Sequence, residues 1–113
     1  MRADRLPEAE VLYSKILALR PTELPALINR SKARNLTGKP RLALQDCNAA
    51  LAIRPNLPIA YVNRAACLLN LGQPDRAKED YERALLLDPE SATARENLER
   101  LARDQAPGGK LHR

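Results

Sequence analysis

The side chains that most often carry out catalysis are few in this chain of 113 residues, and they are not grouped. The single histidine, His112, is next to the C-terminus, and neither Cys47 nor Cys67 has a histidine beside it or the spacing of a metal site. An enzyme needs a base, a nucleophile or a metal held in a fixed geometry. We therefore predict that the chain is not an enzyme, and we expect no catalytic residues, no metal and no cofactor.

Arginine and aspartate recur in a pattern that suggests a structural role. Arg30 precedes Asp46 by the same interval as Arg64 precedes Asp80 (46 − 30 = 80 − 64 = 16). If each arginine lies on one helix and its aspartate on the next, antiparallel helix, the two side chains can meet across the hairpin. We predict structural ion pairs Arg30–Asp46 and Arg64–Asp80, with contact to a ligand as the alternative.

One constant interval runs along most of the chain. It separates Pro21, Pro55 and Pro89 (55 − 21 = 89 − 55 = 34), and we call it the repeat interval. The other triplets at this interval are Ala9, Ala43 and Ala77; Leu17, Leu51 and Leu85; Ala26, Ala60 and Ala94; and Asn29, Asn63 and Asn97. A period of this length indicates stacked repeats, each of which buries its apolar face only against its neighbours.

Each unit is predicted to be a pair of short helices. In residues 25–36 and 58–71, apolar residues recur at steps of three and four, as on one face of a helix. Gly38 then supplies a helix stop and Pro40 a helix start, and both recur one repeat interval later. The second helix ends before Pro55, because the residue before proline disfavours the helical conformation. Since no segment alternates as a strand does, the expected fold class is all-α.

The net charge of +5 comes from one part of the chain. Residues 24–57 hold six basic residues and one acidic residue. Nucleic-acid binding through this surplus is a less favoured alternative, because Trp and Phe are absent and only three Tyr could stack on bases. The basic residues concerned are Arg30, Lys32, Arg34, Lys39 and Arg41.

No part of the sequence is typical of a membrane or an exported protein. No apolar run approaches the ~18 residues of a membrane-spanning helix. Residues 1–10 are charged and lack the apolar core of a signal peptide. We predict a cytoplasmic protein without membrane contact.

Residues 58–91 resemble a complete tetratricopeptide repeat (TPR). The family's signature positions hold Tyr61, Ala65, Gly72, Ala77, Tyr81, Ala84 and Pro89. Residues 24–57 match through Ser31, Gly38, Ala43, Ala50 and Pro55, although Cys47 replaces the usual aromatic residue. Residues 6–21 resemble only the second helix of a preceding unit.

The resemblance implies a TPR helical-hairpin solenoid over residues 1–105. It would comprise a half repeat (6–21), two repeats (24–57 and 58–91) and a C-terminal capping helix (92–104). In the capping helix, the side chains expected to face inward are those of Ala94, Leu98, Leu101 and Ala102. Residues 106–113 are expected to form a flexible tail.

In TPR proteins the first helices of the repeats line a concave groove, where asparagines grip the backbone of an extended peptide. The resemblance therefore implies a non-catalytic adaptor or scaffold that binds a peptide or partner protein. The implied groove residues are Ile28, Asn29, Lys32, Ile59, Val62, Asn63, Ala66, Leu69, Asn97 and Arg100. An apolar middle with Lys32 and Arg100 towards the ends favours a peptide with hydrophobic side chains and an acidic residue or C-terminus.

The steps Asn-Arg-Ser at 29–31 and Asn-Arg-Ala at 63–65 resemble co-chaperone TPR domains, which clamp the C-terminal carboxylate of heat-shock chaperones. That clamp also needs a lysine and an arginine one turn apart on the following first helix. The matching positions are Ile59 and Asn63 in one register, and Thr93 and Asn97 in the other. We therefore expect a co-chaperone-like subtype without a complete carboxylate clamp.

The N-terminal helix leaves a further function open. Its apolar face carries Leu12, Tyr13, Ile16 and Leu17, and no first helix precedes it in the pattern. The chain is either a fragment of a longer array, or it self-associates through this face as a homo-oligomeric assembly element. This structural role is the main alternative to peptide binding.

Overall fold

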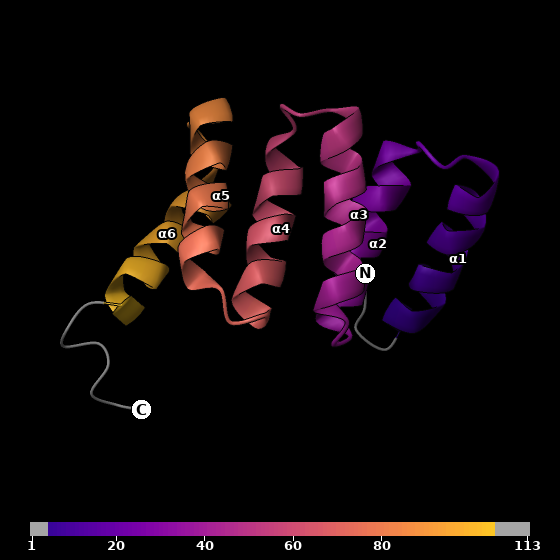
Figure 1. The fold of residues 1–113 in the computed structure, drawn as a ribbon, viewed down its shortest axis with the longest axis horizontal. Helices are drawn as coiled ribbons and strands as arrows, with labels where there is room; N and C mark the ends of the chain where they lie inside the picture. The colour runs from indigo at the N-terminus through magenta and orange to yellow at the C-terminus, as the bar shows by residue number, and fades with distance from the viewer. Residues whose placement is uncertain (1–4, 106–113) are drawn as a thin grey trace.

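The computed structural model describes residues 5–105, in which six α-helices follow one another in a single row (Figure 1). They are α1 (Leu6–Leu19), α2 (Leu24–Leu36), α3 (Pro40–Ile53), α4 (Pro58–Asn70), α5 (Pro74–Leu87) and α6 (Ala92–Gln105). No strand occurs in this range, so the fold is an all-α solenoid. Residues 106–113, predicted to be a tail, lie outside the described residues, as do residues 1–4.

Proline and glycine set the helix boundaries. Proline stands in the first turn of every helix from α1 to α5, where a missing N–H costs no hydrogen bond. Gly38 and Gly72 follow α2 and α4 with φ of 83° and 74°, in the left-handed region. The next residues, Lys39 and Gln73, each donate a backbone hydrogen bond of 2.8 Å to the last turn of the preceding helix. The chain thereby reverses at each glycine into the second helix of the repeat.

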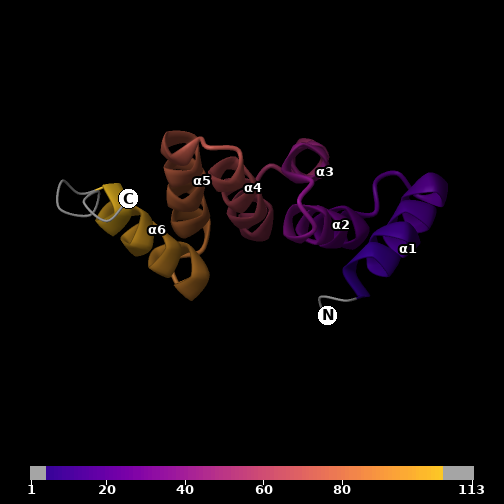
Figure 2. The same ribbon diagram turned by 90° about the horizontal axis from the view of Figure 1, so that it is seen from below.

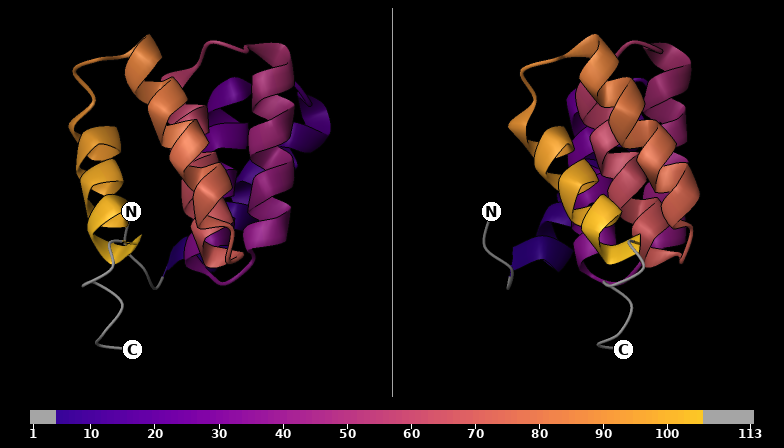
Figure 3. Two further views of the ribbon diagram at one scale, coloured as in Figure 1. Left: turned by 60° about the vertical axis from the view of Figure 1, so that its left-hand side comes forward. Right: turned by 90° about the vertical axis from the view of Figure 1, so that its left-hand side faces the viewer.

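The helices pack as two hairpins with a helix at either end. In the hairpins, α2 packs against α3 and α4 against α5, while α2 also contacts α4. Seen from below in Figure 2, α2 lies on one side of the row and α3 on the other. Figure 3, viewed from the C-terminal end, shows α6 lying across the end of the row beside α5, which it contacts.

Small side chains form much of the core. The fully buried alanines are Ala33, Ala43, Ala50, Ala60, Ala65, Ala77, Ala84 and Ala94. Such residues let helix axes approach to the short end of the ~8–10 Å range. The largest fully buried side chains, those of Tyr81 on α5 and Leu68 on α4, lie in one cluster of the core.

The two ends of the row are each covered on one side only. On α1, Leu17 is buried and Tyr13 partly buried against α2, while Leu12 and Ile16 remain exposed. On α6, Ala94 and Leu101 are buried, but Ala102 is exposed. The inward placement predicted for Ala102 is wrong, because no second helix packs on that side of α6 within residues 5–105.

Candidate binding groove

The first helices of the repeats, α2, α4 and α6, line a series of adjoining hollows that we call the groove. Each of the ten residues predicted for the groove lines at least one of three hollows. We call them the wide hollow, of about 850 Å³, the middle hollow, of about 280 Å³, and the last hollow, of about 290 Å³. Ile59 is shared by the first two hollows, and Ala66 and Asn97 by the last two. The three hollows therefore form one continuous surface along the row.

The middle of the groove is mainly apolar. Ile59 and Leu69 on α4 are 48% and 37% exposed, and Val62 is partly buried between them. Lys32 from α2 and Asn97 from α6 border the same hollow. This part of the groove offers apolar contacts with a cation and amides at its edges.

The three repeated asparagines have different surroundings. The Asn63 side chain donates hydrogen bonds to Ser31 Oγ (3.3 Å) and to the Ile28 carbonyl oxygen (3.4 Å), so it ties α4 to α2. Asn29 is exposed at the wide hollow. Asn97 lies beside the Tyr81 hydroxyl, whose pKa is raised by burial even though the hydrogen bond with Asn97 opposes that rise. The residue type recurs, but of the three only Asn29 has an exposed side chain at a hollow.

Several residues of the groove were missed at the level of sequence. Asn70 donates a 2.8 Å hydrogen bond to the side-chain oxygen of Asn35, and both residues line the hollow next to α6. They are 35 residues apart, one step away from the repeat interval. Arg20 and Arg54 border the wide hollow and do stand at the repeat interval, each before a proline, so this signal was present in the sequence.

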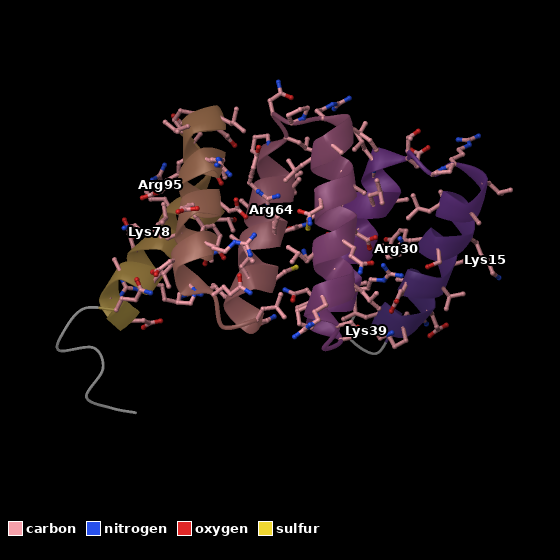
Figure 4. The ribbon with its side chains drawn as sticks, in the orientation of Figure 1. Lys15, Arg30, Lys39, Arg64, Lys78 and Arg95 are labelled. Carbon is pink, nitrogen blue, oxygen red and sulfur yellow. The ribbon has the colours of Figure 1, made fainter. Side chains whose placement is uncertain are left out.

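The predicted ion-pair residues lie inside the hairpins. Arg30 Nε and Nη2 lie 2.9 and 2.7 Å from the two carboxylate oxygens of Asp46. Arg64 contacts Asp80 in the same way, at 2.8 and 3.0 Å. Both aspartates are only 3% exposed. Figure 4 shows Arg30 and Arg64 between neighbouring helices of the row, so these two-point contacts hold each hairpin together.

A second group of charges fastens α1 to the first hairpin. Glu10 on α1 accepts hydrogen bonds of 3.0 Å from both Arg34 and Lys39, and Arg34 also donates to Asp46 at 3.0 Å. Burial alone would raise the pKa of Glu10, but the hydrogen bonds and charges of Lys39 and Arg34 hold that pKa below its ordinary value. Glu10 therefore stays ionised and paired at neutral pH.

The two cysteines offer no reactive thiol at the surface. Cys47 and Cys67 are free and fully buried, in one cluster with Ala43. The hydrogen bond with Cys47, together with burial, raises the pKa of the Cys67 thiol. In the part of the chain from 5 to 105, no three metal-binding side chains gather at one place.

Comparison with known proteins settles the family. The family profile described as "Tetratricopeptide repeat" matches residues 58–91. The first TPR domain of human RPAP3 has 31% sequence identity over 88% of this chain and 78% of its own, with a TM-score of 0.84. The chain belongs to the tetratricopeptide-repeat family. The predicted family and all-α solenoid are thus confirmed, and with them the general class of protein-interaction module.

Other TPR structures are similar to this TPR chain. The first TPR of Spaghetti (RPAP3), bound to the HSP90 peptide SRMEEVD, has 31% identity over 88% of this chain and 79% of its own, with a TM-score of 0.83. The Sgt2 TPR domain from Aspergillus fumigatus has 21% identity and a TM-score of 0.86 over 97% of this chain and 74% of its own, which supports the fold alone. No curated protein sequence matches the chain significantly.

Proposed function

We propose that this TPR protein binds an extended segment of a partner protein along the groove. The observation that carries the proposal is the continuity of the three hollows, which places an apolar floor from α4 between polar groups of α2 and α6. Ile59, Val62 and Leu69 would contact apolar side chains of the ligand. Asn29 would hydrogen-bond to its backbone, and Asn63 would support the groove from within.

The charges around the groove favour an acidic group on the ligand. Arg20 and Arg54 border the wide hollow together with Glu23, Lys32 borders the middle hollow, and Arg100 borders the last hollow with Asp104. Four cations thus face two carboxylates along this surface, which favours a ligand of net negative charge.

The position of the acidic group should differ from that in a complete carboxylate clamp. The similar Spaghetti domain is bound to a peptide that ends in acidic residues, SRMEEVD. In this chain the positions that match the clamp's lysine and arginine hold Ile59 and Asn63 in one register and Thr93 and Asn97 in the other. All four residues line the middle hollow. We therefore place the acidic group of the ligand in the wide hollow, between Arg20 and Arg54.

The other functions considered from the sequence have less support. Of the five basic residues of the nucleic-acid alternative, three are paired with carboxylates, namely Arg30, Arg34 and Lys39. Membership of the family supports a non-catalytic role, since TPR domains are generally interaction modules. Within residues 5–105, no helix is both long and apolar enough to cross a membrane. The cytoplasmic location stays a prediction.

The proposal is tested by selecting ligands from a library of random seven-residue peptides with free C-termini. We expect the selected peptides to combine hydrophobic and acidic residues. The Ile59→Glu variant should lose at least about tenfold in affinity for them, because it places a like charge on the apolar floor; a tenfold loss corresponds to about 1.4 kcal/mol. Affinity is measured by fluorescence anisotropy.

The control carries the same change away from the groove. Leu86 on α5 is 83% exposed and lines none of the three hollows, so Leu86→Glu should bind the selected peptides as the wild type does. The Arg20→Ala/Arg54→Ala variant should lose more affinity for the acidic peptides than for their amidated, glutamine-substituted counterparts. Equal affinity of the Ile59→Glu protein and the wild type would contradict the proposal.

A further inference from the structure

The exposed part of α1, at one end of the row, carries several apolar side chains. Its exposed side chains are Val11 (53%), Leu12 (59%), Ile16 (41%) and Leu19 (85%). Leu12, Ile16 and Leu19 are spaced by four and three residues, so they lie on one side of the helix. In Figure 1, α1 stands at the end of the row, with its one neighbouring helix, α2, on the inner side.

The repeat itself shows what this face is suited to contact. Leu12 stands one repeat interval before Asp46 and two before Asp80, which are the acceptors for Arg30 and Arg64. In the two complete hairpins, this position of the second helix therefore meets a charged residue on the first helix. On α1 the same position is apolar, so this face suits an apolar partner rather than an arginine-bearing first helix such as α2 or α4.

The free α6 helix of another copy is a poor occupant of this face. In an end-to-end stack, α6 would act as the first helix and α1 as the second helix of an intermolecular hairpin. Glu99 stands one repeat interval after Ala65 and two after Ser31, both of which are fully buried. Stacking would thus bury the now exposed carboxylate of Glu99 at a position that holds a small side chain in the complete repeats.

The α1 helix of another copy fits better, because acidic and basic residues of the two helices can face one another. Glu8 and Lys15 are exposed and seven residues apart, so they lie on one side of α1, flanking Val11 and Leu12. If two α1 helices pack antiparallel about a two-fold axis next to Val11 and Leu12, Glu8 of each copy faces Lys15 of the other. Figure 4 shows Lys15 at the outer end of the row, pointing away from the other helices.

We propose that two copies of this protein associate through an antiparallel, two-fold symmetric pairing of their α1 helices. Val11 and Leu12 form the apolar centre of the contact, and two Glu8–Lys15 pairs set its direction. A two-fold contact of this kind closes on itself and forms a dimer rather than a filament. The contact is independent of the middle and last hollows of the groove, which are built on α2, α4 and α6.

The test is the molar mass in solution, measured by light scattering and sedimentation from about 1 µM to about 1 mM, where small interfaces dissociate. We expect the mass to rise from one chain to two. Glu8→Lys and Lys15→Glu should each raise the dissociation constant by about tenfold or more, because each places like charges opposite one another. The Glu8→Lys/Lys15→Glu double variant should return it towards the wild-type value, because both pairs are restored with reversed sign.

A matched pair of variants separates this contact from general stickiness. Leu12→Asp should remain a single chain at every concentration, whereas Leu86→Asp, at an even more exposed leucine on α5, should dimerise as the wild type does. A helical circular dichroism spectrum shows that each variant is folded. A mass of one chain throughout, assemblies larger than two, or single charge reversals without effect would overturn the proposal. Peptide binding by Leu12→Asp shows separately whether the groove functions.

Discussion

At the scale of single residues, the stability of each hairpin depends on a buried charge and its partner. Asp80 is 3% exposed and accepts two hydrogen bonds from Arg64. Arg83 Nη1 also lies 3.6 Å from one of its carboxylate oxygens. The Arg64 guanidinium also lies 5.4 Å from the centre of the Tyr61 ring. Removing the aspartate would leave the arginine largely buried without its main acceptor.

We expect Asp80→Ala to lower the free energy of unfolding by about 3 kcal/mol, because the partner charge is stranded. Urea denaturation followed by circular dichroism measures this change. Glu79→Ala, at the exposed neighbouring position, should change it by less than about 0.5 kcal/mol. The Arg64→Leu/Asp80→Leu variant should lose less than Asp80→Ala, because no charge remains buried. An Asp80→Ala midpoint equal to that of the wild type would show that the pair contributes nothing.

At the scale of elements, α1 is held by a mixture of apolar and charged contacts. Leu17 packs into the core beside α2, while Glu10 is paired with Arg34 and Lys39. Arg30 adds a 3.1 Å hydrogen bond to Ser14. Because α1 packs mainly against one helix, α2, we infer that these polar contacts matter more to its attachment.

The pH dependence of stability should therefore depend on Glu10. Its pKa is lower in the folded chain than the ordinary value of 4.5, so its pairing stabilises the fold above about pH 4.5. This stabilisation is lost as the pH falls through the lower, folded pKa. At pH 6, the free energy of unfolding of Glu10→Gln should be about 1 kcal/mol lower than that of the wild type. The difference should disappear at low pH.

Thermal and urea unfolding at pH 6 and pH 3 measure this difference. Glu82→Gln is the control, since Glu82 is exposed on α5, a helix that does not pack against α1. A difference between Glu10→Gln and wild type that is the same at both pH values would mean that the carboxylate charge does not hold α1.

At the scale of the whole molecule, neighbouring helices share one layered core. Ala77, Ala84 and Tyr81 of α5 pack in one cluster with Ala65 of α4 and Ala94 of α6. In such a stack, stability is the sum of the repeats and of the interfaces between them. A change at an inner position therefore weakens more than one layer.

Ala77→Leu should lower the free energy of unfolding by about 1–3 kcal/mol, because it overpacks a fully buried site. Lys78→Leu adds a leucine at the adjacent exposed position and should leave the stability nearly unchanged. Hydrogen exchange should show faster opening of both α4 and α6 in Ala77→Leu. Exchange that increases in α5 alone would contradict the shared core.

The sequence by itself determined the features that depend on local chemistry and on the repeat. Prolines and glycines mark the helix boundaries through their fixed or left-handed backbone conformations, and the constant repeat interval implies stacked hairpins. The shared spacing of the arginine and aspartate also anticipated which arginine faces which aspartate, because the same glycine turn joins the antiparallel helices of both hairpins.

Only the tertiary structure decided the contacts that the interval does not repeat. Glu10 reaches Arg34 across 24 residues, and Asn70 meets Asn35 across 35, because side chains from neighbouring layers meet at distances set by packing. Asparagines at equivalent positions also have different surroundings, since Asn63 donates a hydrogen bond to Ser31 while Asn29 is exposed. Periodicity in a sequence defines the unit that repeats, whereas the two ends of the stack and the grooves between layers depend on which neighbours are present.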